Sequence, residues 1–328
     1  MRIYHITAHN VFLGGGERLV DSWTANSKFD SIFYAKAGGL NYGNPKFKTY
    51  ETDEELQRIV LALPPTDVVI IHDPFLSNQE WLSKVRRKLW YVHGAFAFTF
   101  NVSSIAKPLF AISNFMPKTT HPSWKDILIA PVHLGVDCLK YMPAKEPRTG
   151  RMVAGIVGRV SEEKCPLYFF DFIDKFNREH PDHNFEFHYY GKTVVNSEWD
   201  IKFKARAAKT LRFFYKGHVE KDEVAKIYHR FDCLVVPSLS ESGSFAILEA
   251  QACGLRVFAL NADGIPYHMT KHSVLCKDYD EIFARLSRFT RRESATIAPK
   301  IRGEMIAEFG LKDWVRKLDA LAEVAGFI

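Results

Sequence analysis

The chain is 328 residues long, with 47% hydrophobic and 25% charged residues and a formal net charge of +6, which is ordinary for a soluble globular protein and long enough for two domains. So mild a charge excludes a strongly basic nucleic-acid-binding arm, and no apolar run reaches the roughly 20 residues that span a bilayer. The N-terminus lacks the apolar core of a signal peptide, and the five cysteines lie far apart without a C-x-x-C pair, as in reduced cytosolic proteins. We therefore expect a cytoplasmic protein, at most peripheral at a membrane.

The first half of the chain alternates short apolar runs with amphipathic stretches. It begins with a predicted strand over 2–7, and a glycine run, Gly14 to Gly16, leads from there into a predicted helix over 17–25, an opening typical of nucleotide-binding α/β domains. Further strands are predicted over 31–35, 67–71, 89–93 and 109–112, and further helices over 53–63 and 79–87. Such alternation predicts a parallel sheet covered on both faces, with ligands at the carboxyl ends of the strands.

Two of these strands end in histidine, one at His72-Asp73 and the other at His93. We expect both rings at the ligand-binding edge of the sheet, although a lone histidine at a strand end is more often structural. Aromatic side chains that can stack on an acceptor crowd around the second strand end. They are Trp90, Tyr91, Phe96, Phe98 and Phe100.

A basic run from Lys84 to Lys88 comes just before Trp90. The segment from Lys84 to Trp90 could contact anionic lipid or a phosphorylated acceptor. The alternative, which is the commoner case, is a solvated helix end.

Charged and turn-forming residues over 144–150 predict a linker, so we place the domain boundary between residues 145 and 146. The second half then restarts with a strand over 152–157. Further strands are predicted over 185–190, 211–215, 233–236 and 256–260, and helices around 167–176, over 222–231, from 245 to 253 and from about 297 onward. This half is a second alternating α/β domain.

The strongest candidate site lies between Val235 and Ala259, where a strand, a small polar loop, a helix and another strand follow one another. Glu241 lies in the loop, and Glu249 lies about one and a half turns into the helix. The amides between them belong to Gly243, Ser244 and Phe245. The first amides of a helix lack intrahelical partners, so this spacing predicts a diphosphate site with Glu249 near a ribose diol and Glu241 near a sugar. The alternative is a solvated loop glutamate and a surface helix glutamate.

A second candidate feature is the turn after the strand over 152–157. Gly158 ends the strand, and Arg159 and Lys164 flank the turn into the next helix. Two cations at such a turn can neutralise a diphosphate, the arginine through its planar fork and the lysine as a point charge. The alternative is a pair of surface cations. Gly191-Lys192 ends the next strand and is expected at the same edge.

Four stretches together resemble the family 4 retaining glycosyltransferases. The residues from Pro237 to Gly254 resemble the E-x7-E signature, and VGRVSEEKC resembles V-G-R-x-x-x-E-K-G. GGGER resembles the first loop of the family, and LGVDCLKYMP resembles its N-G-V-D-x-x-x-F-x-P turn into the linker. The chain departs from these patterns at Gly243-Ser244, where the family has Phe-Gly, and at Leu134, Cys165 and Tyr267, where it has Asn, Gly and Glu.

The resemblance implies the GT-B fold, an α/β architecture of two Rossmann-like domains whose parallel sheets face a central cleft. It implies an acceptor-binding domain over 1–145 and a nucleotide-sugar-binding domain over 146–328, with the last helix, about 305–328, crossing back to the first. It also implies retaining transfer of a hexose-type sugar from a UDP- or GDP-linked donor to a saccharide or glycolipid acceptor, with no metal and no other cofactor.

The resemblance assigns roles to the matching residues. Those with implied catalytic roles are His93, Arg159, Lys164 and Glu241. Those implied to contact the donor are Gly15, Gly16, Gly158, Gly191, Lys192, Gly243, Ser244, Phe245 and Glu249. Those placed on the acceptor side are His72, Asp73 and Phe96.

Several alternatives stay open. They are a nucleotide-sugar epimerase of the same fold, a glycosyltransferase acting on modified nucleic acid, a non-catalytic nucleotide-sugar-binding subunit, and a phosphorylase with a lysine-bound pyridoxal phosphate. Asp278-Tyr279-Asp280 spells the D-x-D of metal-dependent glycosyltransferases of another fold, but its place before a helix favours an acidic helix start. The cluster His180-Pro181-Asp182-His183 is interpreted as a turn.

Overall fold

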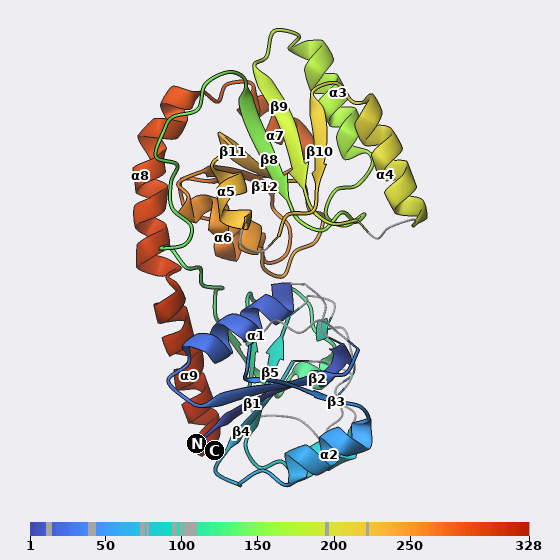
Figure 1. Cartoon of the computed structure of the whole chain (residues 1–328), viewed down its shortest axis with the longest axis vertical. Coiled ribbons are helices and arrows are strands. Elements are labelled where there is room, and N and C mark those ends of the chain that lie inside the picture. The colour runs from blue at the N-terminus through green and yellow to red at the C-terminus, as the bar shows by residue number, and fades with distance from the viewer. Residues whose placement is uncertain are drawn as a thin grey trace. The chain divides into compact units, whose positions relative to one another are not determined.

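The computed structural model describes residues 1–10, 15–38, 44–72, 76, 79–93, 97–98, 101, 110–193, 197–220 and 223–327. The chain forms two compact units (Figure 1). Unit 1 consists of Met1–Gly135 and Leu311–Ile328, and unit 2 consists of Val136–Gly310. Among the described helices, none combines the length and the apolar character needed to cross a bilayer.

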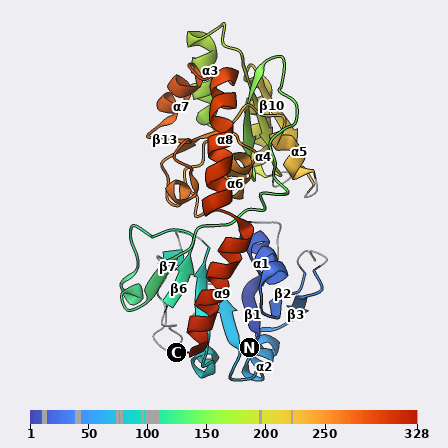
Figure 2. The same ribbon diagram turned by 90° about the vertical axis from the view of Figure 1, so that its left-hand side faces the viewer.

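Unit 1 is built on a sheet of parallel strands in the order β3-β2-β1-β4-β5-β6-β7. The strands are β1 (Ile3–Asn10), β2 (Ser31–Lys36), β3 (Phe47–Tyr50), β4 (Val68–Ile71), β5 (Lys88–Val92), β6 (Phe110–Ser113) and β7 (Leu128–Pro131). The helices are α1 (Gly15–Asn26), α2 (Asp53–Leu61) and α9 (Leu311–Phe327), and the short 3-10 helices are η2 (Glu80–Lys84) and η4 (Pro122–Trp124). Helix α9 packs against α1, β4 and β5 (Figure 2), while α2 covers the opposite face (Figure 1).

The central strands of unit 1 follow the predictions because they are buried on both faces. All four residues of β4 are buried, and such strands show continuous apolar runs that can be recognised locally. The edge strands β3 and β7 were not predicted, since most of their side chains are at least partly exposed and no apolar pattern marks them. The helix predicted over 79–87 is wrong: Trp81 and Leu82 are buried by the 3-10 turn η2, and extended backbone at Val85 ends it.

Unit 2 is built on a second parallel sheet, in the order β10-β9-β8-β11-β12-β13. The strands are β8 (Met152–Val157), β9 (Phe185–Tyr190), β10 (Phe213–Gly217), β11 (Cys233–Val236), β12 (Arg256–Leu260) and β13 (Val274–Cys276). The helices are α3 (Phe169–Glu179), α4 (Glu198–Lys209), α5 (Val224–Tyr228), α6 (Phe245–Ala252), α7 (Tyr279–Leu286) and α8 (Arg291–Glu308), with a 3-10 helix η5 (Ile265–His268). Helix α3 packs on α7, and α6 packs on α5 and α8. The two parallel-sheet α/β domains that we expected are therefore present.

The core of unit 2 is rich in aromatic side chains. Phe170 of α3 packs edge-on against Phe213 of β10, with ring centroids 4.8 Å apart, and Phe203 of α4 joins the same cluster. Helix α4 was not predicted, because Asp200, Phe203 and Ala207 are its only buried residues and leave no continuous apolar face. The buried aromatic face of α3 was predicted, because its residues recur at helical spacing.

The chain passes from unit 1 to unit 2 between Gly135 and Val136, earlier than the linker predicted over 144–150. Arg302 of α8 donates to the carbonyl oxygens of Cys138 and Tyr141, and these bonds hold the segment that follows the boundary to unit 2. The long C-terminal helical pattern is divided in two: α8 belongs to unit 2, and α9 belongs to unit 1.

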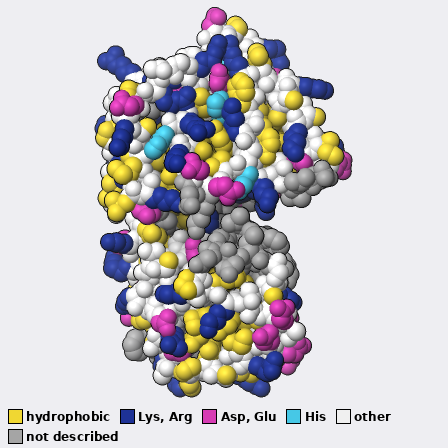
Figure 3. Space-filling model, viewed as in Figure 1, with side chains coloured by type: hydrophobic (Ala, Val, Ile, Leu, Met, Phe, Trp, Pro, Cys, Tyr) yellow, Lys and Arg dark blue, Asp and Glu magenta, His cyan; other side chains and the backbone are white. Residues whose placement is uncertain are grey.

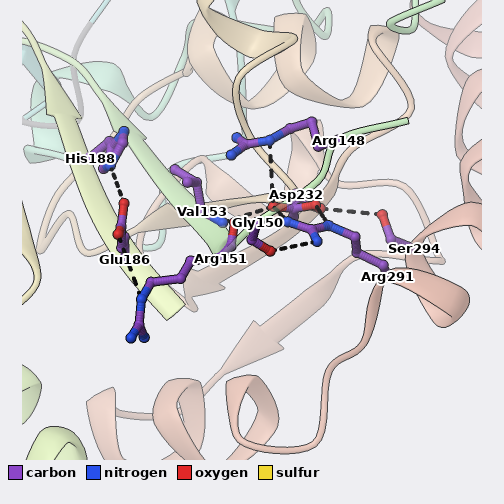
Figure 4. Close-up of polar contacts among 9 residues, drawn as sticks. All are labelled: Arg148, Gly150, Arg151, Val153, Glu186, His188, Asp232, Arg291 and Ser294. Atoms are coloured by element: carbon purple, nitrogen blue, oxygen red, sulfur yellow. Dashed lines mark hydrogen bonds and ion pairs between the residues drawn. The ribbon is translucent and has the colours of Figure 1, made fainter. Parts of the chain in front are cut away.

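At the amino ends of β8 and β11, a buried carboxylate joins three segments of unit 2 (Figure 4). Asp232 is 6% exposed and accepts from the backbone N–H of Val153 at 2.8 Å. It also accepts from Arg291, at 2.7 Å from Nε and 3.2 Å from Nη2, and Nε of Arg148 lies 3.9 Å away. Because Arg291 also donates to the carbonyl of Arg151, the start of α8 is fastened to the start of β8.

Replacing Asp232 with alanine should lower the free energy of unfolding of unit 2 by about 3 kcal/mol, because the buried N–H of Val153 and the partly exposed guanidinium of Arg291 lose their acceptor. Urea unfolding followed by circular dichroism measures the change. The matched control is Arg151→Ala, whose guanidinium pairs with Glu186 at 3.9 Å in a partly exposed position and should contribute less than about 0.5 kcal/mol. Equal effects of the two substitutions would contradict this role for Asp232.

Candidate active site

The loop between β11 and α6 leads into the helix start that the sequence predicted. Helix α6 begins at Phe245, and its N-cap residue, Ser244, is extended (φ −118°, ψ 107°) and makes no side-chain capping bond. The amides at the start of a helix have no intrahelical acceptor and lie at the positive end of the helix dipole. Gly243, Ser244 and Phe245 therefore lie where an anion can be bound.

Two loops that follow neighbouring parallel strands bring a predicted cation and a predicted carboxylate together. Nζ of Lys164, in the loop after β8, lies 2.7 Å from Oε2 of Glu241, in the loop after β11. The loops are joined by a backbone hydrogen bond from the N–H of Leu239 to the carbonyl of Glu163 at 2.8 Å. Because β8 and β11 are paired in the sheet, the pairing of strands far apart in the sequence builds this contact.

The Glu241 carboxylate is largely shielded from solvent, with its side chain 11% exposed against 22% for Lys164. Burial raises the pKa of Glu241, and the Lys164 ammonium and the Ser238 hydroxyl partly offset that rise. The Ser238 hydroxyl donates to Oε1 of Glu241 at 3.3 Å. Lys164 also donates to the carbonyl of Ser240 at 3.3 Å. The carboxylate is thus held in one orientation beside the helix start.

Arg159 lies in the same loop as Lys164 but has a different partner. Its guanidinium donates to Glu163 at 2.7 Å, and its side chain is 65% exposed. Glu163 was not singled out from the sequence, although its spacing of four residues from Arg159 is the signal that would have marked it. An exposed arginine held by one carboxylate is free to exchange that partner for a phosphate.

The loops after β8 and β9 are packed tightly against each other. The N–H of Val160 donates to the carbonyl of Lys192 at 2.9 Å, and a Cβ on Gly191 would lie 1.7 Å from the carbonyl oxygen of Gly158. Only glycine fits there without moving the backbone. The predicted residues Gly158, Gly191 and Lys192 thus lie at the carboxyl edge of the sheet that also carries the Lys164 and Glu241 loops.

Glu249 lies in the interior of unit 2. It is 1% exposed, and Oε2 accepts from the Tyr228 hydroxyl of α5 at 2.6 Å. The alternative of a surface helix glutamate is therefore wrong. Tyr228 was not predicted as its partner, because a single tyrosine within a helix carries no spacing signal.

Unit 1 brings three of the predicted residues together at the carboxyl ends of β4 and β5. Nδ1 of His72 lies 2.8 Å from Nε2 of His93, and a Cβ on Gly16, near the start of α1, would lie 3.4 Å from Nδ1 of His93. The sequence reasoning missed a third ring, His5 of β1, whose Nδ1 lies 2.9 Å from Nε2 of His72. Gly15 is the first residue of α1, while Asp73 and Phe96 lie outside the described residues.

Burial determines the charge of these histidines. It lowers the pKa of His5 to about 3 and that of His93 to about 4. It also lowers the pKa of His72, with the neighbouring rings adding to the effect. All three imidazoles are therefore neutral at pH 7.

Part of the predicted aromatic cluster lies in the hydrophobic core of unit 1. Trp90 is 4% exposed and packs edge-on against Trp124 with ring centroids 5.5 Å apart, and Phe98 is fully buried. These two side chains are not available to stack on an acceptor or to enter a membrane. Phe100 lies outside the described residues.

The two rival constellations have structural explanations. Asp278 is the N-cap of α7 and accepts from the N–H of Glu281 at 2.8 Å, and Asp280 pairs with Lys175 at 2.7 Å, so the interpretation as a helix start is confirmed. The N–H of His183 donates to the carbonyl of His180 at 2.9 Å, which closes the predicted turn. Within the described ranges, no three or more His, Cys, Asp or Glu residues are arranged to hold a metal ion.

Comparison with known proteins shows which proteins this chain is similar to. Residues 151–291 match a family model described as glycosyl transferases group 1. Glycogen synthase of Mycobacterium tuberculosis (strain H37Rv) is 29% identical over 146 residues, 42% of this chain and 33% of that protein. D-inositol 3-phosphate glycosyltransferase of Paenarthrobacter aurescens is 28% identical over 141 residues, 40% of this chain and 34% of that protein. The matches span about a third of the length of these relatives.

Solved structures extend the similarity to both units. Anabaena HepE in complex with UDP has a TM-score of 0.77 at 13% identity, covering 99% of this chain and 100% of that one. A trehalose-6-phosphate synthase has a TM-score of 0.72 at 11% identity, covering 98% of this chain and 99% of that one. Residues 151–291 therefore resemble the glycosyl transferases group 1 domain, and the two parallel-sheet units share the GT-B fold of these solved structures.

Proposed function

We propose that this protein is a retaining glycosyltransferase that moves a hexose-type sugar from a UDP- or GDP-linked donor to a saccharide or glycolipid acceptor. The observation that carries the proposal is the contact of Lys164 with Glu241 beside the uncapped start of α6. It places a cation, a carboxylate and helix amides on adjacent loops of the domain that matches the glycosyltransferase family.

The donor diphosphate is proposed to bind at the start of α6. Backbone amides at a helix start and the ammonium of Lys164 both stabilise negative charge. Arg159, in the same loop as Lys164, adds a planar fork that can engage two phosphate oxygens. The similarity to a structure solved with UDP supports a nucleoside diphosphate at this edge of the sheet.

In the proposed reaction, the bond between the anomeric carbon and the diphosphate breaks, and the acceptor oxygen bonds to that carbon on the same face. The acceptor proton passes to the leaving phosphate oxygen, so charge and atoms balance without a covalent enzyme intermediate. Lys164 and Arg159 stabilise the charge that develops on the diphosphate. Glu241, held by Lys164 and Ser238, orients the sugar by accepting hydrogen bonds from its hydroxyls.

A saccharide or glycolipid acceptor is favoured over nucleic acid. On the face shown in Figure 3, Lys and Arg side chains are scattered over both units instead of forming one stripe, whereas backbone recognition of nucleic acid needs a concentrated basic surface. The names of the relatives, glycogen synthase and D-inositol 3-phosphate glycosyltransferase, support a hydroxyl of a saccharide or cyclitol as the acceptor group.

Incubating the protein with a panel of UDP- and GDP-sugars and measuring release of the nucleotide and the sugar tests the proposal. We expect slow hydrolysis of one donor, with the released sugar first appearing in the donor's own anomeric configuration by NMR. Glu249→Gln should weaken donor binding, while the matched control Asp280→Asn, at an exposed ion pair, should not. An epimerised or inverted product would contradict retaining transfer.

Chelation should leave this activity nearly intact. Lys164, Arg159 and the helix amides are proposed to carry the diphosphate charge, so a rate in EDTA within about twofold of the untreated rate is expected. Loss of activity in EDTA that manganese restores would contradict the proposed mode of phosphate binding.

A further inference from the structure

Three histidines form a continuous hydrogen-bonded row across the sheet of unit 1. His5 comes from β1, and His72 and His93 follow β4 and β5, which are the next strands in the sheet. Nδ1 of His5 lies 2.9 Å from Nε2 of His72, and Nδ1 of His72 lies 2.8 Å from Nε2 of His93. Both distances are those of hydrogen bonds, so each ring contacts the next through the same pair of nitrogens.

The surroundings keep the row neutral. His5 is fully buried and His72 is 8% exposed. The ring of Trp23 lies edge-on to His5 with centroids 4.8 Å apart, and the ring of Tyr91 stacks on His93 at 4.8 Å. A neutral imidazole carries one proton, so one of its nitrogens donates and the other accepts.

Neutral rings linked in this way have two arrangements. Either every Nδ1 carries the proton and the row donates outward, from His5 to His93, or every Nε2 carries it and the row donates inward. The two arrangements differ at Nε2 of His5, the buried end of the row, which carries a proton only in the inward arrangement. Within the part of the chain that the structure describes, Nε2 of His5 is buried without a hydrogen-bond partner.

A buried N–H without an acceptor is less tolerated than a buried acceptor without a donor. The outward arrangement leaves only a lone pair at Nε2 of His5. It therefore places the protons on Nδ1 of all three rings, including Nδ1 of His93, the atom beside Gly16.

We propose that His72 and His5 are positioning residues that lock His93 in its Nδ1–H tautomer, so that a neutral His93 offers a hydrogen-bond donor to a sugar hydroxyl at the carboxyl edge of the unit 1 sheet. The functional part rests on the function proposed above. The row does not conduct protons, because its inner end has neither exposure nor a polar partner among the described residues. Instead, the tautomer of the buried His5 fixes that of His72, which in turn fixes that of His93 at the carboxyl edge of the sheet.

Two other histidines give internal standards for an NMR test. His268 donates from Nδ1 to the carbonyl of Gly264 at 2.8 Å and so represents the Nδ1–H tautomer. His183 accepts at Nδ1 from the N–H of Phe185 at 3.0 Å and lies with Nε2 2.7 Å from Oδ1 of Asn177, and so represents the Nε2–H tautomer. Two-bond ¹H–¹⁵N spectra of the histidine-labelled, ligand-free protein at pH 7 distinguish the two forms.

We expect His5, His72 and His93 to show the nitrogen shifts of His268. Shifts like those of His183 would overturn the proposal, and so would a charged ring in the row. This measurement needs no substrate, so it can fail or succeed independently of the proposed glycosyltransferase activity.

Two substitutions at His5 test the positioning role. His5→Phe keeps an aromatic ring beside Trp23 but removes the donor to His72, so His93 should become a mixture of tautomers. Donor hydrolysis should then fall about tenfold in kcat with little change in KM. His5→Asn places an amide donor where Nδ1 was, and should restore both the tautomer and most of the rate.

Circular dichroism confirms that each variant is folded. Retention of the Nδ1–H form of His93 in His5→Phe, or equal rates in the two variants, would contradict positioning by His5. If no nucleotide sugar is hydrolysed by the unmodified protein, the proposed function fails while the tautomer result stands.

Discussion

Replacing Lys164 with alanine is expected to lower the turnover of donor hydrolysis by at least about 100-fold, and so is Arg159→Ala. Each substitution removes a cation that is proposed to stabilise the leaving diphosphate, an effect expected to be worth about 2.7 kcal/mol or more. Steady-state kinetics with the donor identified by the sugar-nucleotide panel measures the change. The matched control is Lys175→Ala, because Lys175 forms an exposed ion pair with Asp280 in the same unit and its loss should leave the rate within about twofold.

A lower rate in Lys164→Ala has a second explanation, because the substitution also leaves the largely buried Glu241 carboxylate without its cation. The double variant Lys164→Ala/Glu241→Gln separates the two effects. It should regain most of the stability lost in the single variant, measured by urea unfolding, while its turnover stays well below that of Glu241→Gln alone, the reference variant that accounts for the role proposed for Glu241. Near-normal turnover in both Arg159→Ala and Lys164→Ala would defeat the assignment of the phosphate site.

A large loss of stability is expected in unit 1 between pH 6.5 and about pH 4. Burial lowers the pKa of His5 to about 3 and of His93 to about 4, and it lowers that of His72 as well. In the unfolded chain a histidine has a pKa of about 6.5. Over this window the unfolded state binds protons that the folded state refuses, so stability is full above pH 6.5 and falls as the pH falls.

The expected size is about 1.4 kcal/mol per pH unit for each histidine, or about 4 kcal/mol per pH unit for the three together. Urea unfolding at pH 7, 6 and 5, followed by tryptophan fluorescence, measures this change in stability. The fluorescence reports mainly on unit 1, because Trp199 is the only tryptophan of the sequence within the range of unit 2, Val136–Gly310. In His5→Asn the slope should fall by about a third. A slope near zero between pH 6 and pH 5, or an unchanged slope in His5→Asn, would show that the row is not held neutral by burial.

The parts of the fold that could be predicted from the sequence are those whose signal is local. Strands β4, β8 and β11 are short apolar runs closed by polar or turn residues, because both faces of a parallel strand are buried. The loop with Glu241 and the helix with Glu249 follow one another within a single strand, loop and helix unit, so their spacing placed an uncapped helix start correctly. Helix α3 was also predicted, since its buried residues recur every three or four positions.

The elements that were missed have little buried surface or depend on neighbours for their form. Strands β3 and β7 are at sheet edges, and helix α4 buries few side chains, so neither a period of two nor one of 3.6 stands out. The stretch over 79–87 has the apolar spacing of a helix, but packing of Trp81 and Leu82 favours a 3-10 turn. Here the tertiary contacts override local propensity.

The sequence by itself determined which residues have the chemistry for a phosphate site and at which strand ends they lie. Only the tertiary structure decided which of them meet. Lys164 reaches Glu241 because β8 pairs with β11, Glu249 is buried against Tyr228 because α5 packs on α6, and His5 joins His72 because β1 lies beside β4. Strand pairing and helix packing join residues far apart in the chain, and the free energy of those contacts depends on the whole folded core, so no local spacing can reveal them.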